Sequence, residues 1–186
     1  AYTLVVNDDI AGGEIHCAAL VKTAMLEGTP EWIKDFPPEL VLKSPGNDAQ
    51  SPKISVNIKG FSRPVLHFAV RPRADEAAIH VYVAHFKSKA PERVAGAHAQ
   101  NIGYALSTIR RTAEACALRV LLTQTMKAND TPVVVLGDIN DGMLSNTANI
   151  LTEQPRYLSG ETLGGSSTAL YTTQSLQEFR DTRDVY

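Results

Sequence analysis

Three short apolar runs in the first half of the chain have the pattern of β-strands. Ile54 to Ile58 alternates with period two, Val65 to Val70 follows a glycine and a proline, and Ala78 to Phe86 follows a polar turn. Alternation places every second side chain on the same face of a strand. Because the connections are short, we expect these runs to be neighbouring antiparallel strands of one sheet.

The chain before these runs is predicted to be less regular. Tyr2 to Val6 is short and β-like, and Ile15 to Met25 is a mostly apolar stretch that fits a buried strand. From Glu27 to Lys53 the chain contains five prolines and two glycines. This composition predicts an irregular surface excursion.

The second half changes to a helical period. Between Ile102 and Met126 apolar residues recur at helical spacing, as Ala105, Ile109, Ala113, Cys116, Val120 and Leu121. A polar turn ends this helix, and Val133 to Leu136 is then a continuous apolar run, typical of a strand buried on both faces. Ser145 to Leu151 and Ala169 to Phe179 are expected to form shorter helices. Strands, a long helix and another strand predict an α/β or α+β fold.

Composition limits the classes of function. Hydrophobic residues make up 44% and charged residues 20% of the chain, as in ordinary globular proteins. The net charge of −2 is not that of a protein that holds nucleic acid by bulk electrostatics, so a polyanionic substrate would need local basic groups and a metal. No apolar run is long enough to span a membrane, and the first residues lack the features of a signal peptide.

Several residue types are expected to have structural roles. Free cysteine usually packs as a small hydrophobe, and both cysteines lie in apolar stretches, Cys17 and Cys116. Four histidines without metal-ligand spacing are interpreted as structural: His16, His67, His80 and His98. Three arginines of the long helix are predicted to form its solvated face rather than a phosphate groove: Arg110, Arg111 and Arg119.

Polar residues directly follow the last apolar strand, in Gly137-Asp138-Ile139-Asn140-Asp141. Ligands of open α/β sheets bind at the carboxyl ends of the strands. Asp138 and Asn140 are two positions apart, so in an extended chain their side chains share one face. A carboxylate and an amide can hold a hard divalent cation or orient a water. The alternative is a plain turn, because Asp, Asn and Gly are common turn formers.

A second polar cluster ends the strand that begins near Ala78. Alternation places His85 on the same face as Val81 and Val83. A histidine there can donate a hydrogen bond to a phosphate oxygen, and the following Lys87 and Lys89 offer positive charge. The alternative is a histidine with a structural role.

Together the two clusters resemble the endonuclease/exonuclease/phosphatase superfamily. Residues 84–89 (Ala-His-Phe-Lys-Ser-Lys) are similar to the Asn-His-Leu-Lys-Ser-Lys block of its bacterial nuclease-like members, with Ala84 in place of asparagine. Residues 137–141 are similar to the family's Gly-Asp-Phe-Asn-Asp block. Ser62-Arg63-Pro64 resembles the family's Ser-Arg-x-Pro, one residue shorter.

The resemblance implies a deoxyribonuclease I-like α/β sandwich, with mostly antiparallel sheets and outer helices. It also implies Mg²⁺ or Mn²⁺ as the metal and nucleic acid or another phosphoester as the substrate. Asp138 would activate or orient the attacking water, Asn140 would hold that water or the phosphate, and both would lie at the metal. His85 would bind the phosphoryl oxygens. Substrate contacts would come from Arg63, Lys87 and Lys89.

Two family blocks have no counterpart in the chain. The family's Gln-Glu metal ligand would precede Tyr2, and its Asp-His block would follow Tyr186. The resemblance therefore predicts that residues 1–186 are an interior fragment of one family domain. Replacement ligands from Asp8, Asp9 or Glu14 are less favoured than turn or surface roles.

This incompleteness leaves two functional classes open. One is a metal-dependent phosphodiesterase, and the other is a catalytically incomplete remnant that keeps the fold as a binding or structural domain. A partial sandwich also exposes strand edges, so association with a second copy of the chain is a further hypothesis.

Overall fold

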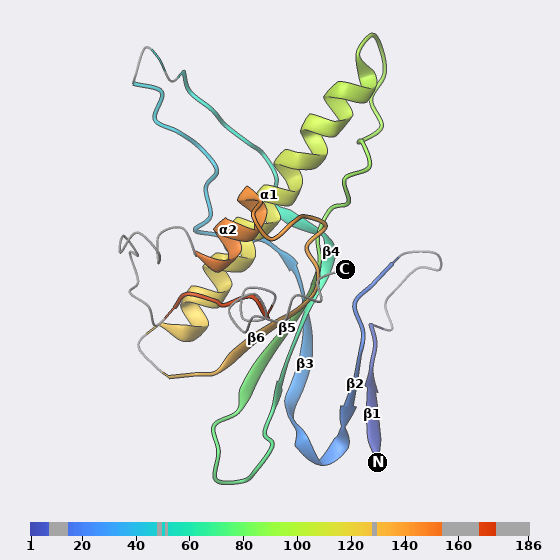
Figure 1. Cartoon of the computed structure of the whole chain (residues 1–186), viewed down its shortest axis with the longest axis vertical. Helices are drawn as coiled ribbons and strands as arrows, with labels where there is room; N and C mark the ends of the chain where they lie inside the picture. Colours follow the sequence, from blue (N-terminus) through green and yellow to red (C-terminus); the bar gives the residue numbers. More distant parts are fainter. Residues whose placement is uncertain (8–14, 48–49, 51, 128–129, 154–167, 174–186) are drawn as a thin grey trace, which may run out of the picture.

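The computed structural model describes residues 1–7, 15–47, 50, 52–127, 130–153 and 168–173. Within these residues the chain is a mixed α+β protein with two sheets and two α-helices (Figure 1). The strands are β1 (Tyr2–Val5), β2 (Ala19–Lys22), β3 (Leu26–Asp35), β4 (Gly60–Val70), β5 (Ile79–His85) and β6 (Val133–Asp138). The helices are α1 (Ala99–Met126) and α2 (Asn146–Thr152), with a 3-10 turn at Thr23–Met25.

The larger sheet has the strand order β3-β4-β5-β6. β3 and β4 are antiparallel, as are β4 and β5, whereas β6 is parallel to β5. Parallel neighbours need a long crossover, and α1 supplies it. The carboxyl ends of β5 and β6 therefore lie at the same edge of the sheet.

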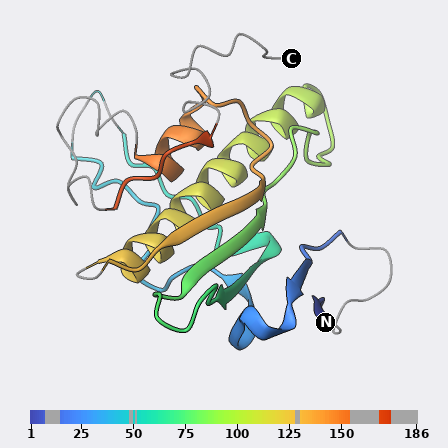
Figure 2. The same ribbon diagram turned by 60° about the horizontal axis from the view of Figure 1, so that its bottom comes forward.

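One face of this sheet packs against α1, with α2 beyond it (Figure 2). On β5 the buried Tyr82, Ala84 and Phe86 face the helix, as alternation predicts. α1 contributes small and large apolar residues to this core: Ala113, Ala115, Ala117, Leu118, Leu122 and Met126. Alanines let the helix axis approach the sheet closely, and the leucines fill the remaining space. This is the main core of the protein.

The opposite face is partly covered by the antiparallel pair β1-β2. Val5 and Val21 of this pair pack against Leu66, Phe68 and Val81 of the larger sheet. The predicted strand over residues 15–25 is thus shorter than expected, because only residues 19–22 pair and residues 23–25 form the 3-10 turn. A second, smaller layer on the sheet agrees with an α/β sandwich in coarse outline.

The second neighbour of β4 is β3, and the sequence-based prediction was wrong on this point. Residues 54–58 are not a strand; they contribute one isolated bridge, Lys43 to Ser55, and Ile54 is exposed. Residues 27–35, which belong to the stretch predicted to be irregular, instead form most of β3. As an edge strand, β3 accommodates Gly28 and Pro30 where its register with β4 shifts.

β6 is also exposed more than expected. Val134 and Leu136 are 41% and 52% exposed, so the prediction of a strand buried on both faces was wrong. Within the described residues β6 is the edge of its sheet, and only its α1 side is covered, at Val133 and Val135. Its apolar run reflects strand propensity together with burial on one side.

Two shorter helices were predicted after β6, and the structure describes the first completely and the second in part. α2 confirms the helix expected over residues 145–151, and the hydroxyl of Ser145 caps it by accepting from the backbone N–H of Ala148 at 3.1 Å. Of the helix expected over 169–179, residues 169–172 are not helical, residue 173 is helical, and residues 174–179 lie outside the described part. Among the described residues, no helix combines the length and apolar character of a membrane span.

Candidate functional site

The carboxyl ends of β5 and β6 bring the two polar clusters of the sequence together. In the parallel register His85 is the direct partner of Asp138, and Ala84 is the partner of Gly137. Direct partners in adjacent strands hold their side chains next to each other. His85 extends the face that Val81 and Val83 share, away from α1, and is only partly exposed, whereas Asp138 is exposed. A carboxylate and an imidazole thus share one open edge.

Gly137 makes this close approach possible. Its φ of +117° lies in a region that favours glycine, and a Cβ there would overlap the carbonyl group of Ala84. The glycine therefore allows β6 to run against β5 up to the position of Asp138.

Asn140 turns the chain directly after the strand. Its φ is +54°, and its backbone N–H donates to Asp138 Oδ1 at 2.7 Å. Its side-chain Nδ2 donates to the carbonyl oxygen of Phe86 at 2.9 Å. Residues 138–140 therefore form a turn, which was the alternative interpretation of this sequence. The turn also fixes the side-chain amide of Asn140. With Nδ2 committed to Phe86, Asn140 Oδ1 is the atom left to accept from a water or to bind a cation.

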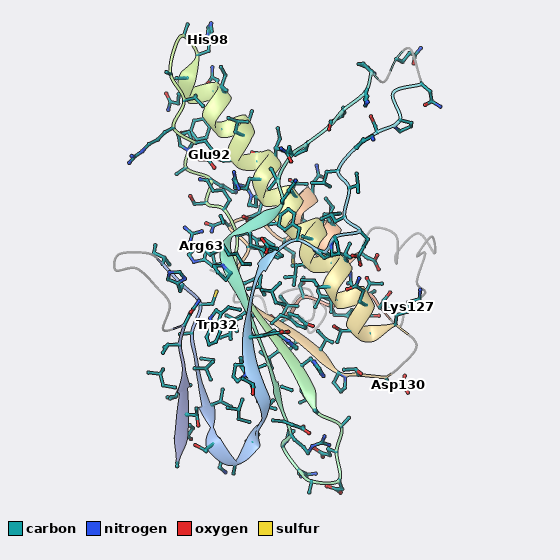
Figure 3. The ribbon with its side chains drawn as sticks, turned by 180° about the vertical axis from the view of Figure 1, so that it is seen from behind. Trp32, Arg63, Glu92, His98, Lys127 and Asp130 are labelled. Atoms are coloured by element: carbon teal, nitrogen blue, oxygen red, sulfur yellow. The ribbon has the colours of Figure 1, made fainter. Side chains whose placement is uncertain are left out.

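Arg63 reaches the same carbonyl group from β4. Its guanidinium Nη1 donates to the Phe86 oxygen at 3.2 Å, and the residue is half-buried where β4 begins (Figure 3). Pro64 follows it where β4 pairs with neither neighbour, so the missing N–H costs no ladder hydrogen bond. Three predicted site residues therefore lie together at the end of β5: His85 is its last residue, and Arg63 and Asn140 both bind the carbonyl oxygen of Phe86.

The two predicted lysines lie on the chain that leaves β5. Lys87 Nζ donates to the carbonyl oxygen of Ala90 at 3.0 Å. Lys89 Nζ lies 3.2 Å from Asp141 Oδ1 and is mostly exposed. Both add positive charge to the rim of the candidate site, by which we mean the residues around the carboxyl ends of β5 and β6. Each of the two lysines also has a partner within the protein.

The buried Arg111 and the partly buried Asp141 form an ion pair that the sequence did not predict. Arg111 is 4% exposed, and its Nε donates to Asp141 Oδ2 at 3.3 Å. Burial alone raises the pKa of Asp141, but hydrogen bonds from Thr147, Lys89 and Gly142, with the charge of Arg111, outweigh it. The pKa falls from 3.8 to about 2. Asp141 is therefore ionised over the physiological pH range, and it anchors the chain after β6.

The prediction that the helix arginines are solvated was wrong for two of the three. Arg111 and Arg119 are 4% and 6% exposed, and Arg119 Nη1 donates to the carbonyl oxygen of Leu151 in α2 at 3.3 Å. Only Arg110 has a partly open position, where it pairs with Glu92 at 3.3 Å. The buried arginines face α2 and the loop after β6, which the helical period alone does not reveal.

Glu114 is fully buried and was missed as a functional candidate. Its Oε1 accepts the backbone N–H of Ser62 at 2.7 Å, and its Oε2 accepts that of Lys87 at 2.6 Å. These donors lie at the start of β4 and just after β5. Glu114 is the one acidic residue of α1 and lies within an alanine-rich stretch. A single carboxylate among small apolar residues indicates a buried acidic group with dedicated partners, and this is how the sequence could have revealed it.

The oxygen atoms at the rim could supply only part of the coordination shell of a hard divalent cation. Asp138 has one carboxylate oxygen beyond the bond to Asn140, and Asn140 offers Oδ1. Within the described residues no group of three or more His, Cys, Asp or Glu side chains is placed to hold a metal ion. Mg²⁺ commonly takes one or two protein oxygens and completes its shell with water and substrate phosphate, so the two-oxygen set fits that cation. The alternative ligands Asp8, Asp9 and Glu14 lie outside the described residues.

Two of the histidines interpreted as structural form a hydrogen-bonded line at the other end of the sheet. Glu31 Oε1 lies 2.7 Å from His67 Nδ1, and His67 Nε2 lies 2.9 Å from His80 Nδ1. The His67 ring also stacks on Tyr82, with centroids 4.3 Å apart. Burial lowers the pKa of His80, and the charge of His67 lowers it further, against a smaller opposing effect of Glu27. The line joins β3, β4 and β5.

Comparisons of this chain with protein-family models, curated proteins and solved structures find no match.

Proposed function

We propose that this chain is a metal-dependent phosphoester hydrolase with a deoxyribonuclease I-like fold, in the endonuclease/exonuclease/phosphatase superfamily. The observation that carries the proposal is the direct pairing of His85 with Asp138 at the ends of β5 and β6, with Asn140 tied to the same strand end. The two motifs that resemble the family are more than fifty positions apart in the chain, as the 54 positions from Phe86 to Asn140 show. Their meeting at one edge is what a shared site requires.

Each rim residue has a role suited to phosphoester cleavage. Asp138 accepts a proton from the attacking water or orients it, and Asn140 Oδ1 accepts a hydrogen bond from that water. His85 donates to a phosphoryl oxygen and stabilises charge that grows in the transition state. A bound Mg²⁺ or Mn²⁺, held by Asp138 and Asn140, would supply charge neutralisation of the phosphate.

The charge around the rim favours an anionic substrate. Arg63, Lys87 and Lys89 all lie at the start of β4 or just after β5, beside His85. A phosphodiester brings one negative charge per linkage, and fixed arginine and lysine groups position it without reading a base. A nuclease or related phosphodiesterase is therefore the preferred member of the class.

The test is hydrolysis of bis(p-nitrophenyl) phosphate and of plasmid DNA by the full chain, with Mg²⁺, with Mn²⁺ and with chelator. We expect metal-dependent cleavage that falls roughly 100- to 1,000-fold in Asp138→Ala, because the variant loses a group that acts in the transition state. The matched control is Asp130→Ala, an exposed aspartate before β6, at the opposite end of that strand from Arg63 (Figure 3).

Two results would contradict the proposal. One is the absence of cleavage by the folded chain under every metal condition. The other is cleavage that persists in Asp138→Ala at the level of the control.

A further inference from the structure

The peptide unit between Phe86 and Lys87 is held from both sides. Its N–H, from Lys87, donates to Glu114 Oε2 at 2.6 Å. Its carbonyl oxygen, from Phe86, accepts from Asn140 Nδ2 at 2.9 Å and from Arg63 Nη1 at 3.2 Å. In a trans peptide the N–H and the C=O point in opposite directions. The buried carboxylate therefore lies at one end of this peptide dipole, and two rim side chains lie at the other.

The environment of Glu114 makes this arrangement strong. The residue has no exposed surface, and both its oxygens accept short hydrogen bonds from backbone N–H groups. Bonds to an ionised group are about twice as strong as neutral ones, and low polarity around them strengthens them further. The same carboxylate accepts the backbone N–H of Ser62, the residue before Arg63, so it also fixes the backbone next to one of the two partners of the Phe86 carbonyl group.

A negative charge at the N–H end polarises the peptide toward its oxygen. Bonds in such a chain strengthen one another, by about 10–30% per bond. The Phe86 oxygen is then a better acceptor for the Asn140 amide and for the positive Arg63 guanidinium. Because Nδ2 of Asn140 is bonded there, the orientation of the whole amide, and with it the position of Oδ1, is fixed by the Phe86 oxygen.

We propose that Glu114 is a positioning residue that acts through this one peptide unit on Asn140 and Arg63. Its effect on catalysis rests on the proposed hydrolase function, whereas its effect on the Asn140 amide does not. Glu114 has no contact with a substrate in this arrangement. Its influence is carried by the Phe86–Lys87 peptide.

The experiment is Glu114→Gln in the full chain, followed by NMR of the Asn140 side-chain NH₂ and by kinetics. Glutamine keeps the size but removes the charge, and its NH₂ group would face a backbone donor. We expect the Asn140 NH₂ resonances to move toward those of a free amide and to exchange faster with solvent. We also expect kcat to fall by about 10- to 100-fold, as for other residues that orient a catalytic group.

A double-mutant cycle separates positioning from general loss of stability. In the Glu114→Gln background, Asn140→Ala should cost at least about tenfold less in kcat than in the native chain, because the amide is already misplaced. The matched control is Glu92→Gln, the same chemical change at the partly exposed partner of Arg110. It should leave the Asn140 resonances and kcat unchanged.

The outcomes distinguish this proposal from the proposed function. If the chain has no hydrolase activity but its Asn140 resonances still respond to Glu114→Gln, the positioning role of Glu114 is supported and the proposed function is rejected. Unchanged Asn140 resonances in folded Glu114→Gln, or strictly additive kinetics, would reject the link. If Glu114→Gln does not fold, Asn140→Ala gives the reciprocal test. It should shift the Lys87 amide proton upfield, and an unchanged Lys87 resonance would overturn the proposal.

Discussion

Position 137 needs a residue without a side chain, for two separate reasons. Its φ of +117° is strained for any residue with a Cβ, and that Cβ would overlap the carbonyl group of Ala84. Gly137→Ala should therefore lower the free energy of unfolding by about 3 kcal/mol, from backbone strain and overpacking together. Urea denaturation measures this, and hydrolase activity should fall with it because Asp138 is displaced.

A nearby glycine provides the control for this prediction. Gly142 has no atom within 4 Å of a Cβ position, and its φ is not in the left-handed region. Gly142→Ala should change the free energy of unfolding by less than about 1 kcal/mol. Equal effects of the two substitutions would contradict the account of Gly137.

At the scale of single residues, the sequence predicted what local geometry controls. The face of His85 follows from strand alternation, and the structure places it beside Asp138. The expectation that Asp138 and Asn140 share one face of an extended chain was wrong, because β6 ends at Asp138 and Asn140 has a φ of +54°. Glu114 and Arg111 were missed because their partners come from distant segments. A charged residue on a helix is expected in solvent, and only knowledge of the partners reveals that burial is compensated.

At the scale of the element, side chains of α1 bind three chain segments, and we call this set of contacts the α1 clamp. Glu114 binds the start of β4 and the end of β5, and Arg111 binds Asp141 after β6. Arg111 Nη1 also donates to the carbonyl oxygen of Lys87, at 3.4 Å. The helix thus sets the spacing of the strand ends that carry the candidate site.

Adjacent arginines of α1 allow a direct test of this clamp. Arg111→Ala leaves Asp141 without its buried partner, so the free energy of unfolding should fall by about 3 kcal/mol. Arg110→Ala removes only a partly exposed pair with Glu92, and the cost should be below about 1 kcal/mol. Thermal and urea unfolding of the two variants measure the difference, and similar losses would exclude the clamp.

The elements that the sequence predicted correctly are those with a clear local period. The helix over residues 102–126 and the strand over 78–86 are present with nearly the expected bounds, whereas the strand expected over 65–70 begins earlier, at Gly60. β3 was missed because its glycine, proline and charged residues mask a strand whose hydrogen bonds come from β4. The run at 54–58 alternates correctly but has no neighbouring strand to pair with apart from one bridge, so its pattern was not sufficient.

At the scale of the whole molecule, stability should depend on pH through His80. Burial lowers the pKa of His80 in the folded protein, and the nearby charge of His67 adds to this. Below the ordinary value near pH 6.5 the unfolded chain binds a proton that the folded chain does not. Lowering the pH from 7.5 to about 5.5 should therefore reduce the free energy of unfolding.

Equilibrium urea unfolding at a series of pH values measures this dependence. The charges that act on His80 are those of His67 and Glu27. Glu31 is hydrogen-bonded to His67, and Arg71 is hydrogen-bonded to Glu27. His80→Asn keeps a side-chain donor and removes the titration, so the profile between pH 5.5 and 7.5 should flatten. The same change at His98, an exposed residue whose φ of +63° suits asparagine, should leave the slope unaltered.

A different pH range tests Asp141. Its pKa is lowered from 3.8 to about 2, so its stabilising contribution is complete above pH 3.8 and is lost as the pH falls toward 2. Asp141→Asn should remove the part of the acid transition that lies in this range. An acid transition identical to that of the native chain would show that Asp141 contributes nothing to it.

The crossover from β5 through α1 to β6 also sets the order in which the molecule is built during synthesis. β4, β5 and α1 all precede β6 in the chain, and Glu114 needs only Ser62 and Lys87 to satisfy both its oxygens. Local pairs form quickly, and parallel pairing across a long connection forms slowly. The bonds of Glu114 to the start of β4 and the end of β5 can thus form before β6 pairs with β5. The edge of β5 remains unpaired until β6 adds to it, and this one pairing brings Asp138 and Asn140 to the candidate site.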